Sequence, residues 1–73
     1  MMAGQSPFTN RIRKMRFEHG ELTQEELAKR VGVTRQTIIA LEADRYVPSL
    51  FLAVRLAGVF DIPVEELFVL SGD

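Results

Sequence analysis

The hydrophobic positions along the chain recur mostly at spacings of three and four residues, the period of an amphipathic α-helix. Polar and small residues interrupt this pattern at the points where helices would start and stop. The pattern predicts one helix capped by Thr9 or Asn10 and ending near Glu18, then four more over about residues 24–31, 35–43, 50–60 and 63–68. No stretch alternates as a strand would, so we expect an all-α fold, a compact unit of five helices.

Capping residues support these boundaries. Thr23, with Glu26 three residues on, has the spacing of a capping box before the second predicted helix. Gly32 suits the left-handed residue that ends this helix, and Thr34 can cap the next one after a very short turn. Ser49 can cap the fourth helix in the same way. The second and third helices are therefore short and joined by a tight turn.

These helices would enclose a single small core, because a chain of 73 residues forms one small domain. We expect residues 9–70 to form that domain, between a flexible N-terminal tail at 1–8 and a C-terminal tail at 71–73. The positions assigned to the core are Ile12, Met15, Leu22, Leu27, Ala28, Val31, Val33, Ile38, Leu41, Leu50, Leu52, Ala53, Leu56, Ala57, Phe60, Leu67 and Phe68.

Some apolar residues are left over once this core is assigned. Phe51, Val54 and Val59 fall outside the main stripe of the fourth helix, and Val69 and Leu70 extend the apolar run past the fifth. Surplus apolar surface on so small a domain often marks contact with a partner. The alternative is a few singly exposed apolar side chains, which are common on protein surfaces.

Composition excludes several classes of protein. The chain has no cysteine and one histidine, which leaves no thiolate for a disulfide, a metal or a nucleophile. The adjacent carboxylates of Glu25 and Glu26 diverge around a helix and cannot converge as an acid–base pair. We therefore expect no enzyme, no cofactor and no metal. No apolar stretch approaches membrane-spanning length, so we expect a soluble, cytoplasmic protein without a membrane partner.

The net charge of −1 hides an uneven distribution. Residues 1–45 carry eight Lys or Arg and six Asp or Glu, whereas residues 46–73 carry one and four. The first sixteen residues hold four cations and no acid, namely Arg11, Arg13, Lys14 and Arg16. A basic face opposite an acidic end would steer the protein toward DNA, although an ordinary mixed surface could have the same composition.

The third predicted helix begins with side chains suited to reading bases. With Ile38 and Leu41 turned inward, its first turn presents Arg35, Gln36 and Thr37 outward. Arg can donate two hydrogen bonds to guanine, and Gln can pair in a similar way with adenine. Two short helices, a tight turn and such a first turn are typical of a helix-turn-helix, whose second helix enters the major groove.

This segment resembles the Cro/phage-repressor (XRE-like) helix-turn-helix family. The resemblance runs from about Asn10 to Leu70 and rests on four motifs, Leu22-Thr23-Gln24-x-x-Leu27-Ala28, Gly32-Val33-Thr34-x-x-x-Ile38 with Glu42, Arg45-Tyr46-x-Pro48-Ser49-Leu50-x-Leu52-Ala53, and Pro63-x-Glu65-Glu66-Leu67-Phe68. The family implies base-reading roles for Arg35, Gln36, Thr37 and Ala40. It implies phosphate contacts for Gln24, Thr34 and Arg45, with Arg11 and Tyr46 as weaker candidates. Arg35 could instead contact a phosphate.

The resemblance also implies a structural ion pair. An Arg late in the first helix would form a partly buried, bidentate bridge with the Glu that ends the third, here Arg16 and Glu42. This match requires one extra residue in the loop at 19–21. The chain departs from the family after Glu42, where Asp44 replaces the usual Gly. The negative charge of Asp44 could weaken the contact of this loop with DNA.

The sequence therefore predicts a sequence-specific double-stranded DNA-binding transcriptional regulator, a repressor that acts as a homodimer on a two-fold operator. The candidates for the dimer interface are Phe68, Val69, Leu70, Phe51 and Val59. The alternative is an antitoxin-like or coactivator-like protein-interaction module on the same scaffold, with a partner such as a toxin. The polar first turn of the third helix favours DNA binding.

Overall fold

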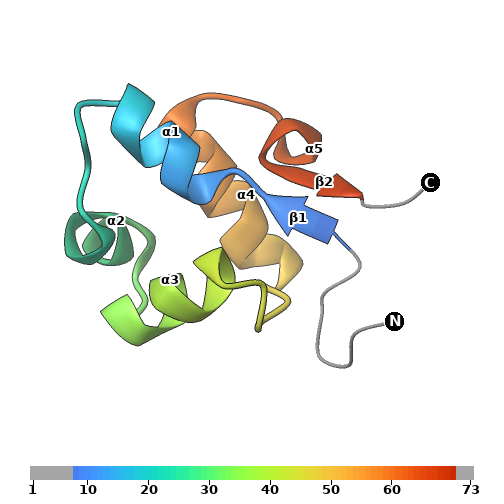
Figure 1. Ribbon diagram of the computed structural model, residues 1–73, viewed down its shortest axis with the longest axis horizontal. Coiled ribbons are helices and arrows are strands. Elements are labelled where there is room, and N and C mark those ends of the chain that lie inside the picture. The colour runs from blue at the N-terminus through green and yellow to red at the C-terminus, as the bar shows by residue number, and fades with distance from the viewer. Residues whose placement is uncertain (1–7, 71–73) are drawn as a thin grey trace.

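The computed structural model describes residues 8–70, with five helices and two short strands (Figure 1). In chain order the elements are β1 (Phe8–Asn10), α1 (Ile12–Glu18), α2 (Gln24–Val31), α3 (Arg35–Glu42), α4 (Leu50–Phe60), α5 (Val64–Leu67) and β2 (Phe68–Leu70). All five expected helices are present, which confirms the helical fold class. Residues 1–7 of the tail expected at 1–8, and the tail expected at 71–73, lie outside the described residues.

The expected caps define the helix-turn-helix. The Thr23 hydroxyl accepts from the Glu26 N–H at 3.0 Å, and the Glu26 carboxylate accepts from the Thr23 N–H at 2.9 Å, which completes the capping box. Gly32 ends α2 in the left-handed conformation with φ of 77°. The hydroxyls of Thr34 and Ser49 cap α3 and α4. Local sequence thus sets where these three helices begin.

A single hydrophobic cluster joins all five helices. Its fully buried side chains come from α1, α2, α3, α4 and α5, and are Ile12, Leu27, Ile38, Leu41, Leu56, Phe60 and Leu67. Met15, Val33 and Phe68, which we also assigned to the core, are partly buried and pack against the cluster. The core therefore holds α3 against the rest of the molecule.

Leu50 is a correction to the predicted core, because its side chain is 77% exposed. The Ser49 cap fixes the start of α4, and the helix then turns Leu52 and Leu56 inward. Leu50 lies two positions before Leu52, which is about 200° around a helix of 3.6 residues per turn. It therefore faces away from the core.

The small sheet is a second correction, since we expected no strand. β1 pairs with β2 in antiparallel register, with Thr9 opposite Val69. As a result α5 ends at Leu67 rather than Phe68, and Phe8, assigned to the tail, has its backbone in β1. Strands of three residues are too short to show a two-residue period, and their pairing joins the two ends of the domain. Figure 1 shows them side by side at the right of the molecule.

Candidate nucleic-acid interface

The first turn of α3 carries the polar side chains expected to read bases. Arg35 and Gln36 are exposed there, and Thr37 is half-buried. The Thr37 hydroxyl lies 3.2 Å from that of Thr34, so these two groups hydrogen-bond to each other. Ala40, one turn later, is half-buried. The arrangement leaves Arg35 and Gln36 as the side chains that extend farthest into solvent from this turn.

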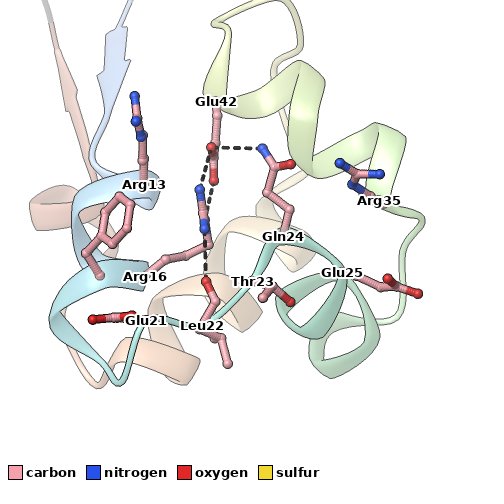
Figure 2. Close-up of a pocket in the computed structure, with 10 residues that line it drawn as sticks. Arg13, Arg16, Glu21, Leu22, Thr23, Gln24, Glu25, Arg35 and Glu42 are labelled. Carbon is pink, nitrogen blue, oxygen red and sulfur yellow. Dashed lines mark hydrogen bonds and ion pairs between the residues drawn. The ribbon is translucent and has the colours of Figure 1, made fainter.

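A carboxylate at the end of α3 ties three helices together (Figure 2). Glu42 accepts from Arg16 at two oxygens, with Nε–Oε2 at 2.7 Å and Nη2–Oε1 at 3.1 Å. The Arg16 and Glu42 side chains are 11% and 10% exposed. Arg16 Nη1 also donates to the carbonyl of Leu22 at 2.9 Å, so the expected bidentate bridge between α1 and α3 is present and well bonded. It is the one ion pair among residues 8–70.

Gln24 belongs to this network. Its amide Nε2 donates to Glu42 Oε1 at 3.1 Å, which holds the side chain against the end of α3. An amide nitrogen has two hydrogens, and this bond uses only one. Gln24 is also the first residue of α2, where unpaired backbone N–H groups and the helix dipole favour an anion. The structure therefore places an oriented amide donor at a helix end suited to a phosphate.

An open cleft of about 670 Å³ surrounds this network between α1, α2 and α3. Figure 2 shows Arg13 on one side and Arg35 on the other, with Gln24 and Glu42 between them. The acids Glu21 and Glu25 line the cleft as well. Arg16 is paired with Glu42, so within the described residues the unpaired basic side chains of the cleft are Arg13 on α1 and Arg35 on α3.

The loop after α3 is fastened at Asp44. Asp44 adopts the left-handed conformation with φ of 59°, and its carboxylate accepts from Asn10 Nδ2 at 2.9 Å. The same nitrogen donates to the carbonyl of Leu41 at 2.7 Å. Asp44 is thus held by β1, while the following Arg45 and Tyr46 are exposed. These two side chains therefore lie on the surface beside the end of α3.

Two residues at this surface were not identified from the sequence. Asn10 was expected only as a helix cap; its Oδ1 does accept from the Ile12 N–H at 3.1 Å, but its amide also fastens β1 to the end of α3. Arg13 was noted only as part of a basic run. The acid-free stretch at the start of α1 was the available signal for Arg13, whereas nothing local pointed to the second role of Asn10.

The expected dimer residues fall into two groups. Val59 and Phe68 pack against the core, whereas Phe51 and Leu70 are 71% and 80% exposed and Val69 is 40% exposed. Other apolar side chains near the start of α4 are also exposed. We define the α4 apolar surface as four side chains that are each more than half exposed, Val47, Leu50, Phe51 and Val54.

The fold and this interface define a helix-turn-helix domain of the Cro/phage-repressor type. A family model described as helix-turn-helix matches residues 12–67, and the chain belongs to this family of DNA-binding transcriptional regulators. A protein from Methanothermobacter thermautotrophicus is 60% identical over 63 residues, which cover 85% of this chain and 90% of the relative. One from Archaeoglobus fulgidus is 51% identical over 63 residues, 86% and 89% of the two chains.

Both archaeal relatives are named as uncharacterized HTH-type transcriptional regulators, in agreement with the expectation that this chain is not an enzyme. The phage CTXphi transcriptional repressor RstR of Vibrio cholerae is 37% identical over 60 residues, 82% of this chain and 53% of that protein. A crystal structure from Bacteroides fragilis, provisionally described as DNA-binding, has a TM-score of 0.73 and 26% identity over 84% of this chain and 97% of that one. Within residues 8–70, no helix is long and apolar enough to span a membrane.

Proposed function

We propose that this protein is a repressor that binds a specific double-stranded DNA sequence as a homodimer. The observation that carries the proposal is the exposed first turn of α3, where Arg35 and Gln36 extend from a helix that the core and the Arg16–Glu42 pair hold in place. Side chains on the first turn of a recognition helix reach the base edges of the major groove. Thr37 and Ala40 would make shorter contacts in the same groove.

Phosphate contacts would flank this helix on both sides. Gln24 lies at the start of α2, and Arg45 and Tyr46 lie in the loop after α3, with Arg11 at the edge of β1 and α1. Thr34 caps α3 with its hydroxyl, so its backbone would approach the phosphate. Such contacts fix the register of a protein on DNA, while base contacts supply specificity.

The homodimer and the repressor activity have separate support. One recognition helix reads only a few base pairs, and two-fold sites match two-fold proteins. The α4 apolar surface offers a place for a second copy of the chain. The likeness to a phage repressor supports repression over activation. The same apolar surface is what an antitoxin-like or coactivator-like module would use to bind another protein, such as a toxin.

Selection of bound duplexes from a random pool tests the proposal directly. We expect recovery of one site with two-fold symmetry. Arg35→Ala and Gln36→Ala should each lose about 1–3 kcal/mol on that site and relax the preference at one position. Equal weakening on selected and random DNA would make these residues phosphate contacts. Failure to enrich any duplex would contradict DNA reading and favour the protein-interaction module.

A further inference from the structure

A second hollow lies beside the cleft, on the surface of α1. It has a volume of about 400 Å³ and is lined by Asn10, Arg11, Arg13, Lys14, Phe17 and Glu42. Three of these side chains are cationic, and the only acid, Glu42, already pairs with Arg16. The hollow therefore presents uncompensated positive charge, unlike the neighbouring cleft, where Glu21 and Glu25 contribute acids.

The hollow and the cleft share a wall. Arg13, Phe17 and Glu42 line both of them, so the hollow adjoins the cleft along these three side chains. Glu42 stands at the junction and is neutralised by Arg16. A polyanion lying on Gln24 would reach the hollow past the paired Glu42, while Glu21 and Glu25 stay on the wall of the cleft.

Arg13, which lines both the hollow and the cleft, lies against an aromatic ring. Its guanidinium lies 5.7 Å from the centroid of the Phe17 ring, and Phe17 is 54% exposed. A cation over a ring face keeps its hydrogen-bond donors available at the edge of the guanidinium plane. In the described part of the chain Arg13 has no acidic partner. An oriented, unpaired guanidinium with five donors suits a phosphate.

We propose that this hollow receives a phosphate of the DNA backbone, with Arg13 as its main ligand and Arg11 and Lys14 as secondary cations. The DNA contact would then extend beyond the helix-turn-helix onto α1. This inference rests on the proposed function, because it places the same DNA on a longer track. It adds affinity without adding base specificity, since a phosphate carries no sequence information.

The first test is the salt dependence of binding to the selected duplex. Arg13→Ala should reduce the slope of log K against log salt by about 0.9, the value for one phosphate contact on B-DNA. The loss of affinity between about 50 and 200 mM salt should then be about 3.5-fold smaller than in the parent protein. The weakening should be equal on selected and unrelated duplexes, and Arg13→Lys should keep the parental slope.

Arg55→Ala is the matched control. Arg55 lies 5.5 Å from the ring centroid of the exposed Phe51 on α4, so it has the same kind of ring contact away from the hollow. Its replacement should leave the salt slope unchanged. If Arg13→Ala has the same salt slope as Arg55→Ala and the parent, the proposal is overturned. The proposed function would still stand in that case, because the parent protein binds its selected site.

A second measurement needs no change to the protein fold. Single phosphates of the selected duplex are replaced one at a time by neutral methylphosphonates, and binding is compared for the parent and Arg13→Ala proteins. We expect one position per half-site where neutralisation weakens the parent but not the variant. If every position weakens both proteins by the same factor, Arg13 contacts no phosphate. If the parent protein selects no duplex at all, the proposed function itself is wrong. That result differs from both outcomes of the methylphosphonate experiment.

Discussion

Glu42 shows how much a single side chain can contribute to the position of a recognition helix. It is bonded to Arg16 on α1 and Gln24 on α2 while it ends α3, so three helices meet at one carboxylate. Charged groups this deeply buried are stable only while both partners remain. The role of this residue is therefore to hold α3 at its angle, and we propose that any effect of its loss on DNA binding follows from that.

Removal of one partner of this pair should be costly. We expect Arg16→Ala to destabilise the fold by about 3–5 kcal/mol, because Glu42 would keep a buried charge without its cation. Urea unfolding followed by circular dichroism measures the loss, with the exposed Arg55→Ala as control. A variant that unfolds like the parent but no longer binds DNA would instead place Arg16 in direct contact with DNA.

At the scale of the elements, the β1–β2 pair is connected to the recognition helix. Asn10 ends β1, and its amide bonds both the last turn of α3 and Asp44 in the following loop. The loop that presents Arg45 is therefore set in part by the first strand of the domain. Two distant segments of chain thus determine the shape of the surface proposed to contact the DNA backbone.

The variant Asn10→Ala tests this connection. It leaves the Asp44 carboxylate without the Asn10 donor and the Ile12 N–H without the Asn10 acceptor, whereas the Leu41 carbonyl keeps the Asp44 N–H as a donor. The loss should cost about 1–3 kcal/mol of stability. DNA affinity should fall alike on selected and unrelated duplexes, because the Arg45 loop shifts. Thr9→Ala, an exposed change in the same strand, is the control for unfolding and binding. Equal behaviour of the two variants would contradict a role for the Asn10 bonds.

The capping box of α2 gives a prediction for pH. The backbone N–H of Thr23, followed by its hydroxyl, lowers the pKa of Glu26 below its ordinary value of 4.5. A folded-state pKa below the unfolded one means that the box stabilises the fold above about pH 4.5 and that this stability is lost as the pH falls through the lowered pKa.

Urea unfolding between about pH 6 and 3 tests this effect, because Glu26→Gln should remove part of the loss of stability on acidification. Glu25→Gln removes the same charge from the same turn without touching the box. If both variants change the pH dependence equally, the box makes no specific contribution.

At the scale of the whole molecule, the exposed apolar residues of α4 gather away from the first turn of α3, which we propose reads bases. The α4 apolar surface begins in the loop after α3, and beside it a shallow hollow of about 280 Å³ is lined by Val47, Pro48, Leu50, Ala53, Val64 and Phe68. Four side chains offer less area than the roughly 800 Å² per partner of a typical stable interface. We therefore expect a dimer that is weak in free solution and completed on DNA.

A charge placed on this surface should separate dimerisation from folding. Leu50→Glu should leave the melting temperature close to that of the parent, because Leu50 is exposed, but should prevent two copies from binding one operator. Sedimentation at rising concentration, with and without the selected duplex, measures this. Gly58→Glu adds the same charge to an open position on the same helix and should behave as the parent. If the Leu50→Glu protein fills both half-sites cooperatively, the α4 apolar surface is not the dimer interface.

The same experiment also tests the dimer candidates in β2, Val69 and Leu70. Leu70 is exposed at the end of β2, next to the edge of the sheet. If Leu70→Glu blocks double occupancy and Leu50→Glu does not, the second copy binds at β2. The two variants thus distinguish a dimer interface at β2 from one at the α4 apolar surface.

Local sequence patterns predict much of the secondary structure of this protein. Helical spacing, the Thr23, Thr34 and Ser49 caps and the left-handed Gly32 determine where α2, α3 and α4 start or stop, because each acts within one turn of chain. The outward placement of Arg35 follows from the same spacing. The sequence by itself therefore determined the helix-turn-helix and its polar first turn.

What the tertiary structure decided depends on contacts between residues far apart in the chain. The pairing of β1 with β2 and the second role of Asn10 each follow from how whole elements pack, and no local sequence pattern predicts them. The same holds for the basic hollow. Its net charge is positive because Glu42, which lines it beside Arg13, is paired with Arg16. Charge and burial become properties of a site only after folding brings distant residues together.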